Sequence, residues 1–337
     1  VAINRQGDAL LLASDTQVQL VAPSRTVQAP ATIFEPCTPP QAGVYVADAG
    51  VYLLTICSVE AGDGSAVVSG LGGQPSGCNI RYAVDAVQFR LIEIPLTAGE
   101  LSQPNLLRNR IAYGCFGMDP LRYAIDPFAG IGSSATALDE LRPRTLTDCD
   151  VPLAAIYWTA TAGLVWIDMW SVRRRVARSN AAASAAAEDD ALMATAEAMR
   201  EQFLAQIADQ TATGTSPLAA MASDSFEHLP PAGLLPIAIG SNIRAFGYAQ
   251  FFSGMTFKPP VYIEGGALAA LLHHSSQFPP IDVNSAEMIW LYFVRENMQV
   301  HDGGFANQPY VVFANANLPF YGESRFDRSH YDYSNYV

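Results

Sequence analysis

The sequence predicts an α+β, β-rich protein in which two β-sandwich-like or barrel-like units flank one long amphipathic helix. Short runs of β-forming residues, bounded by glycine and proline, recur in residues 1–97 and again in residues 216–337. Between them, apolar residues recur every three or four positions, which is typical of a helix. The predicted segments are an N-terminal β-rich domain (1–97), a mixed segment with an aromatic hairpin (98–180), the helix with its joints (181–215) and a C-terminal β-rich unit with an aromatic tail (216–337).

In the N-terminal segment, residues 51–57 form a short apolar run of β-formers, and residues 87–91 alternate apolar with polar side chains. Both patterns predict strands. Residues 62–77 are rich in glycine and serine, and residues 36–43 contain three prolines. These two stretches are therefore predicted to be loops that connect strands of a small sandwich or barrel.

The mixed segment is predicted to contain a short helix over residues 104–113, followed by a hairpin. Residues 154–159 and 163–170 are the two β-prone runs of this hairpin, separated by Ala160, Thr161 and Ala162. Their aromatic content indicates a sheet that is buried or forms an interface.

The clearest helix is predicted over residues 184–210, with acidic residues near its start, where the helix dipole favours negative charge. Its apolar stripe consists of Leu192, Ala196, Met199, Phe203 and Ile207. Two interpretations are open: the helix packs on its own domain, or it docks on a neighbouring subunit.

In the last third, the prolines of residues 229–236 exclude a regular helix and predict an extended strap. Residues 260–264, 288–295 and 309–314 then read as strands of a second β-rich unit. The terminal residues 331–336 offer aromatic anchors on a segment too short to fold alone, so we expect them to dock on another surface.

Charge composition narrows the classes of partner. The chain has 337 residues with 19 basic and 32 acidic side chains, a formal net charge of -13, and only 15% charged residues. Nucleic-acid binding is not expected, because phosphate recognition needs a basic face. Lys258 is the single lysine, so positive charge comes from arginine, which suits bidentate pairing at interfaces but also follows from a GC-rich genome.

The one dense basic cluster consists of Arg173, Arg174, Arg175 and Arg178. In an acidic chain these guanidinium groups are expected to find carboxylates, either within their own fold or on a neighbouring copy. The cluster is therefore a candidate interface, together with the aromatic tail residues Tyr331, Tyr333 and Tyr336.

The sequence predicts no enzymatic activity, catalytic residue, cofactor or metal site. It contains no GxGxxG, phosphate-binding loop, GxSxG or HExxH motif, and residues 130–134 read as a plain glycine-containing turn. His273, His274, His301 and Asp302 are interpreted as polar surface or interface residues rather than metal ligands, because adjacent histidines rarely share one ion.

Five scattered cysteines without a CxxC pair, namely Cys37, Cys57, Cys78, Cys115 and Cys149, are expected to be mostly buried thiols. No basic-then-apolar leader is visible at the start of the chain, and no apolar run is long enough to span a bilayer. Cytoplasmic synthesis without a membrane span is therefore expected.

Three stretches together resemble structural proteins of viruses and phage-like particles, without a single diagnostic motif: residues 147–153 (TDCDVPL), 229–236 (LPPAGLLP) and 289–295 (IWLYFVR). The resemblance is to coat, tail or baseplate subunits and covers residues 40–337. It implies a multi-copy structural subunit that contacts other subunits of the same assembly and ends in a virion or released particle. It implies no catalytic residues.

Two other functions are weighed beside this one. Trp158, Trp166, Trp170 and Trp290 could stack on sugar rings in a carbohydrate- or surface-binding module, although aromatic residues in strands are more often core. Asp148, Asp150 and Asp168 could divide acid and base roles in a hydrolase, although an acidic chain offers such pairs by chance.

Overall fold

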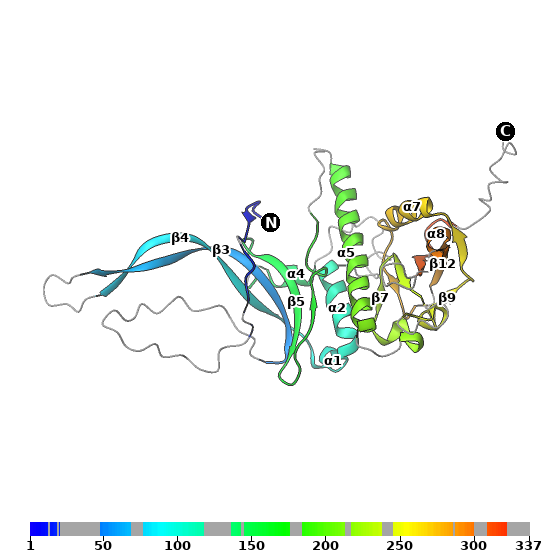
Figure 1. The fold of residues 1–337 in the computed structure, drawn as a ribbon, viewed down its shortest axis with the longest axis horizontal. Coiled ribbons are helices and arrows are strands. Elements are labelled where there is room, and N and C mark those ends of the chain that lie inside the picture. The colour runs from blue at the N-terminus through cyan, green and yellow to red at the C-terminus, as the bar shows by residue number, and fades with distance from the viewer. Residues whose placement is uncertain are drawn as a thin grey trace. The chain divides into compact units, whose positions relative to one another are not determined.

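The computed structural model describes residues 1–12, 14–18, 20, 48–68, 77–117, 136–142, 145–175, 184–212, 217–237, 245–285, 287–299 and 309–321, without the side chains of residues 61–68, 77–81 and 184–189. They form a mixed α+β structure with several sheets, as the sequence predicts (Figure 1). The chain divides into two compact units, one made of residues 1–96 and 139–167 and the other of residues 97–138 and 168–337.

Unit 1 is built on a four-stranded sheet. Its strand order is β4 (Gly77–Ile94), β3 (Gly50–Val68), β5 (Val151–Thr159) and β6 (Gly163–Asp168). Strand β3 is antiparallel to both β4 and β5, with Val51 opposite Ile94 on one side and opposite Tyr157 on the other. A small antiparallel pair, β1 (Ala2–Ile3) and β2 (Ala9–Leu10), and the short helix α4 (Ala137–Glu140) complete the named elements.

The strands predicted at residues 51–57 and 87–91 are confirmed, and so is the hairpin that β5 and β6 form. The loop predicted at residues 62–77 is wrong for its first part, because β3 continues to Val68 and pairs there with Gly77 at the start of β4. Small residues weaken a strand but do not exclude one, and the cross-strand hydrogen bonds satisfy the backbone along the whole ribbon. The predicted loop at residues 36–43 lies outside the described residues.

Unit 2 contains a mixed sheet in the order β10 (Val261–Ile263), β12 (Met288–Val294), β13 (Tyr310–Asn315) and β8 (Ala232–Pro236), with β9 (Thr256–Phe257) also pairing with β12. Strands β12, β13 and β8 are antiparallel neighbours, whereas β9 and β10 run parallel to β12. A separate pair is formed by β7 (His228–Leu229) and β11 (Ile281–Asp282). All three strands predicted in this region are confirmed, and the extended strap at residues 229–236 supplies β8.

The described helices of unit 2 are α1 (Ala98–Leu101), α2 (Pro104–Phe116), α5 (Ser184–Ala212), α6 (Tyr248–Phe251), α7 (Gly265–Ser275) and α8 (Arg295–Gln299), with short 3-10 turns at Pro217–Ala219 and Ala222–Asp224. Helix α2 starts with a proline, whose missing N–H is harmless in the first turn, and ends at Gly117 with φ 72°. The predicted helices at 104–113 and 184–210 are both confirmed and extend a few residues further.

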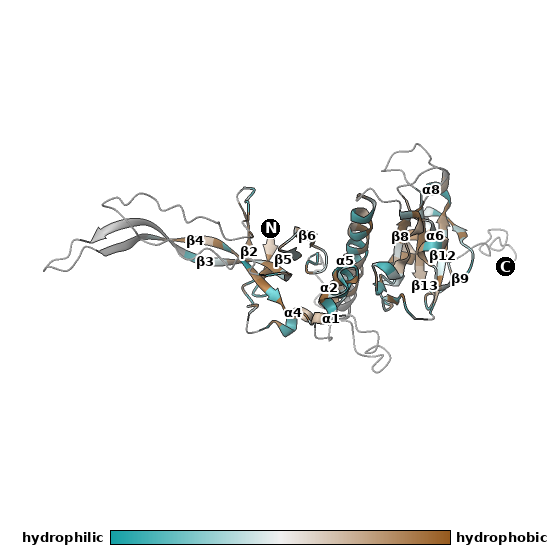
Figure 2. Cartoon of the chain, turned by 90° about the horizontal axis from the view of Figure 1, so that it is seen from below, coloured by the Kyte–Doolittle hydropathy of each residue, from teal (hydrophilic) through white to brown (hydrophobic). Residues whose placement is uncertain are grey.

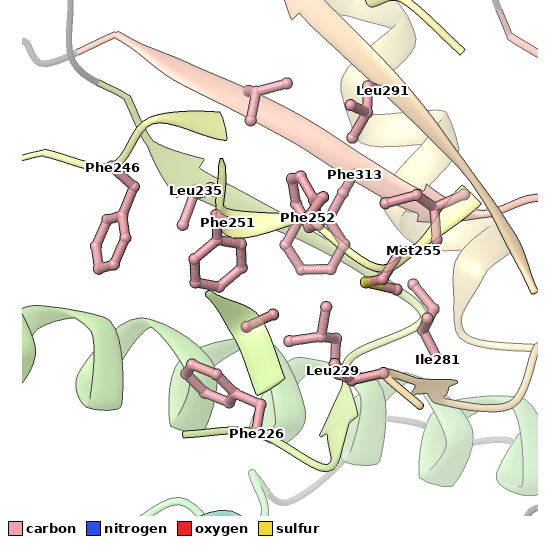
Figure 3. Close-up of a cluster of buried hydrophobic side chains, with 14 of the residues drawn as sticks. Phe226, Leu229, Leu235, Phe246, Phe251, Phe252, Met255, Ile281, Leu291 and Phe313 are labelled. Atoms are coloured by element: carbon pink, nitrogen blue, oxygen red, sulfur yellow. The ribbon is translucent and has the colours of Figure 1, made fainter. Parts of the chain in front are cut away.

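The sheet of unit 2 is covered on both faces. On one face, Phe203 and Ile207 of α5 pack with Leu235, Leu291 and Phe313 in an aromatic-rich cluster, most of which is drawn in Figure 3. On the other face, Leu271 of α7 packs with Ile263, Tyr292, Val312 and Ala314. Figure 2 shows hydrophobic residues along β8, β12 and β13 and a mixture of hydrophobic and hydrophilic residues along α5.

The predicted pair of sandwich- or barrel-like units is therefore not confirmed, and the described strands form no closed barrel. In unit 2 the layers that face the sheet are helices, so that β13 is buried on both faces and reads as a continuous apolar run. Of the two interpretations of α5, packing on its own unit is confirmed by its buried residues Met199, Phe203 and Ile207.

Candidate assembly surfaces

The arginine cluster does not act as one surface. Arg173 and Arg175 are exposed, and the Arg175 guanidinium lies 2.6 Å from a carboxylate oxygen of Glu197 on α5. Arg174 is half-buried, and Arg178 lies outside the described residues. The arginines of the described part of this candidate interface therefore differ in their environments, and Arg175 finds its carboxylate within its own fold.

Arg174 holds its own segment in place. Its guanidinium donates hydrogen bonds to the backbone carbonyls of Trp170 (3.1 Å), Ser171 (3.2 Å) and Arg173 (2.8 Å), and it lies 4.7 Å from the centre of the Phe116 ring. Burial lowers the pKa of Arg174 to about 10, because the charged form loses its hydration there. Arg174 therefore stabilises the backbone conformation of residues 170–173.

The second part of the candidate interface, Tyr331, Tyr333 and Tyr336, lies outside the described residues. At the last described residue, Tyr321, the backbone N–H donates to the Tyr292 hydroxyl at 3.2 Å, and the Tyr321 hydroxyl contacts Nδ1 of His274 on α7. The chain is thus held against β12 and α7 up to this point.

The three aspartates considered for hydrolysis each pair with an arginine. Asp150 is buried and accepts hydrogen bonds from Arg90 (2.6 Å), from the Thr147 hydroxyl (2.7 Å) and backbone N–H (2.8 Å), and from the Thr55 hydroxyl (3.2 Å). Burial acts to raise the pKa of Asp150, but the hydrogen bonds from Thr147 and the charge of Arg90 outweigh it and hold this pKa below its usual value. An ionised carboxylate with all these partners is a structural anchor of unit 1.

Asp168 has a similar environment in unit 2. Arg108 on α2 donates to it from Nε at 3.0 Å and reaches Asp209 on α5 from a terminal nitrogen at 2.5 Å, while Gln202 donates to Asp168 at 3.1 Å. Asp148 is exposed and pairs with Arg142 at 2.7 Å. Asp148 and Asp150 belong to unit 1 and Asp168 to unit 2, and each of the three has its own arginine partner.

The four tryptophans considered for sugar binding are all half-buried. Trp166 lies 5.8 Å from the ring of Tyr157, and Trp290 lies 4.8 Å from the ring of Phe320 while its indole N–H donates to the Leu318 carbonyl at 3.2 Å. Both rings therefore serve as packing partners within their units.

Histidine and cysteine residues are dispersed. His273 and His274 lie at the end of α7 with ring centres 5.9 Å apart, and His301 and Asp302 are outside the described residues. Within the described part of the chain, no group of three or more potential metal ligands occurs. Cys57 and Cys115 are buried, as expected, and burial raises the pKa of Cys115 to about 12; Cys149 is half-buried.

One exposed surface belongs to the hairpin that the sequence predicts to be buried or to form an interface, although its residues were not singled out as candidates. Four large apolar side chains on and just after β6 are exposed, namely Leu164, Val165, Ile167 and Met169. The strand β6 is the last in its sheet among the described strands. A signal was available, because residues 151–167 contain no charged side chain although the chain as a whole is strongly acidic.

A second feature was also missed, because its sequence was interpreted as a loop. Strand β5 pairs with β3 only from Gly50 to Ile56, whereas β3 and β4 continue as a two-stranded ribbon from Cys57 opposite Gln88 to Val68 opposite Gly77. Figure 1 shows this ribbon as the long blue and cyan arrows. Its described side chains at residues 82–85 are exposed, including Tyr82 and Val84.

Within the described residues, no helix combines the length and the apolar character needed to cross a membrane. No family model, no curated protein and no solved structure matches the chain.

Proposed function

We propose that this chain is a structural subunit of a large multi-copy protein assembly, of the kind that forms the coat, tail or baseplate of virus and phage-like particles. The proposal includes synthesis in the cytoplasm, other subunits of the same assembly as partners, and neither catalysis nor nucleic-acid binding. The observation that carries it is the β3–β4 ribbon of unit 1.

A two-stranded ribbon has few ways to stabilise itself, because it has no third strand and no opposing layer against which to bury side chains. Beyond Ile56 the ribbon has no third strand among the described elements, and the register nevertheless continues for twelve further residues of β3 up to Val68. A ribbon of this length, with Tyr82 and Val84 exposed, is well suited to lie on a surface outside its own sheet. In a multi-copy assembly that surface belongs to another subunit.

The polar contacts described above support the same proposal. Asp150 and Asp168 are buried and bound by arginines, so that their charge stabilises the fold of each unit. The exposed apolar side chains of β6 add a second surface that burial against a partner would stabilise.

The first test is the mass of the native complex, measured by light scattering on material purified from its source without dissociation. A complex in the megadalton range is the expected result. A monodisperse monomer at high concentration, also in the presence of the products of neighbouring genes, would overturn the proposal.

The second test shortens the ribbon. Residues 60–85 are replaced by Asn-Gly, which suits a two-residue turn, so that Val59 and Ala86 remain opposite each other as in the native register. The variant is expected to keep the circular dichroism spectrum and melting temperature of the wild type, because β5 covers only the part of β3 that is retained. It should no longer assemble into the native complex; full assembly with the shortened ribbon would contradict the role proposed for it.

A further inference from the structure

The part of the β3–β4 ribbon just beyond β5 has two chemically different faces. In an antiparallel pair, directly opposed side chains share a face and successive side chains alternate between faces. Val59 lies opposite Ala86, and Val84, the next residue of β4 on that face, is 39% exposed. Glu60 and Asp85 lie opposite each other on the other face, where both are exposed. This stretch of the ribbon is therefore apolar on one face and acidic on the other.

Strand β6 presents a second apolar face in the same unit. The Trp166 ring lies against the buried Tyr157, so the Trp166 side of β6 faces the interior of unit 1. Because side chains alternate along a strand, Val165 and Ile167 lie on the opposite, outer face, where they are 47% and 48% exposed. Met169, which follows the strand, is 45% exposed. Val165, Ile167 and Met169 are called the outer β6 face below.

The ribbon and the outer β6 face of one copy cannot pack on each other. Val84 lies opposite Ala61, five residues beyond Ile56, the last residue of β3 that pairs with β5. At about 3.3 Å per residue, this position is roughly 17 Å past the end of that pairing. β6 belongs to the same sheet and lies on the other side of β5 (Figure 1). Parts of one sheet lie side by side rather than face to face, so a ribbon that covers β6 must come from another copy.

The charge distribution favours the same contact. Two copies of a chain with a net charge of -13 repel each other, so they approach at the lowest electrostatic cost where their surfaces carry no charge. Residues 151–167 contain no charged side chain, and the ribbon keeps Glu60 and Asp85 on the face opposite Val84. Packing the apolar ribbon face on β6 therefore leaves these two carboxylates in water.

We propose that the apolar ribbon face of one copy, around Val84, packs on the outer β6 face of a second copy of this chain. This inference rests on the proposed function, because it names the surface on which the ribbon lies. The two surfaces are different, so the contact is head to tail and leaves one ribbon and one β6 face for further copies. Such a contact repeats from copy to copy and builds a ring or a filament.

A head-to-tail contact can be tested by blocking each surface in a different chain. Val84→Glu blocks the ribbon and keeps β6 native, whereas Val165→Glu blocks β6 and keeps the ribbon native. Each full-length variant alone is expected to self-associate at least about tenfold more weakly than the wild type, because the contact would bury an unpaired carboxylate. An equimolar mixture retains one native contact, and is expected to form a one-to-one complex that does not grow further.

The measurement is sedimentation velocity over a range of chain concentrations up to about 0.5 mM, where even a Kd near 0.1 mM gives a large bound fraction. The matched control is Ala83→Glu, which adds the same charge next to Val84 but on the acidic face of the ribbon, where Ala83 is exposed. This control is expected to associate like the wild type. Thermal unfolding checks that every variant is folded.

Four results would overturn the contact: a wild type that does not self-associate, a Val84→Glu variant that associates as strongly as the wild type, an equally large effect of Ala83→Glu, or a mixture that associates no better than its components. The native mass separates this inference from the proposed function. A megadalton complex into which Val84→Glu assembles normally overturns this contact alone, whereas a monomeric native chain overturns both.

Discussion

At Asp150, burial and hydrogen bonding have opposite effects on one carboxylate. Burial favours the neutral acid, while the hydrogen bonds from Thr147 and the guanidinium of Arg90 favour the anion and prevail. The folded state therefore binds a proton at this site less readily than the unfolded chain does. The contribution of Asp150 to stability is present above the unfolded pKa of about 3.9 and is lost as the pH falls through the lower folded pKa.

The substitution Asp150→Asn is expected to lower the free energy of unfolding at pH 7 by about 2 kcal/mol, because it removes the charge that Arg90 and Thr147 bind. The difference from the wild type should begin to shrink below about pH 4, where the unfolded chain takes up a proton at Asp150 before the folded state does. Urea unfolding at pH 7 and pH 3 measures both effects.

The matched control for this substitution is Asp148→Asn, because Asp148 also pairs with an arginine but its side chain is 61% exposed. A change below about 0.5 kcal/mol is expected for the control, since water screens such a pair. Equal effects at both positions would contradict the assignment of Asp150 as the anchor.

The arginine cluster leads to a second prediction at the residue scale. Arg174→Ala should lower the free energy of unfolding by about 2 kcal/mol, because three carbonyls and the Phe116 ring lose their cationic partner. Arg175→Ala removes a largely exposed pair with Glu197 and is expected to change it by less than about 1 kcal/mol. Chemical denaturation of the two variants measures both changes in the free energy of unfolding. A larger change for Arg175→Ala than for Arg174→Ala would contradict the structural role assigned to Arg174.

At the scale of elements, β8 shows how tightly a strand is fitted to its neighbour. A Cβ atom added to Gly233 would lie 2.5 Å from Cζ and 2.9 Å from Cε1 of Phe313, the residue opposite it in β13. Phe313 is fully buried in the aromatic cluster that α5 covers, so its ring has little room to move. Glycine at this position is required by the close approach of the ring.

Gly233→Ala is therefore expected to lower the melting temperature and to destabilise unit 2 by about 1–3 kcal/mol through overpacking. Gly266→Ala is the control, because a Cβ atom on this residue of α7 meets nothing within 4 Å. The control should be neutral or slightly stabilising, by up to about 1 kcal/mol, since alanine is the better helix former. Calorimetry on both variants tests the fit, which an unchanged melting temperature for Gly233→Ala would refute.

Most elements were predictable because their signals are local. The stripe of Met199, Phe203 and Ile207 identified α5, and the β-prone runs identified β5, β6, β12 and β13. The errors occur where pairing is decided by a distant segment: residues 62–68 have turn-like composition but are held in β3 by β4. Likewise, the apolar sequence of residues 310–315 does not indicate whether a second sheet or a layer of helices covers this strand.

At the scale of the whole molecule, the net charge of -13 opposes any association between copies. If contacts between copies are mainly apolar, like the exposed side chains of β6, added salt should strengthen self-association by screening this repulsion. Sedimentation of the wild type at about 20 mM and about 150 mM NaCl, with Debye lengths of roughly 20 Å and 8 Å, tests this expectation. Weaker association at the higher salt concentration would instead favour contacts between arginines, such as Arg173, and carboxylates of a neighbour.

The sequence by itself determined the α+β class, the two longest predicted helices, most of the strands and the acidic, arginine-based charge balance. These depend on local periodicity and composition, which a single chain displays directly. Only the tertiary structure decided that helices cover both faces of the unit 2 sheet, that Asp150 is buried against Arg90 and Arg174 bonds to three backbone carbonyls, and that apolar side chains of β6 and of the β3–β4 ribbon are exposed. Burial and strand pairing are set by residues far apart in the chain. Apolar strands of similar composition can therefore be buried, as β13 is, or largely exposed, as β6 is.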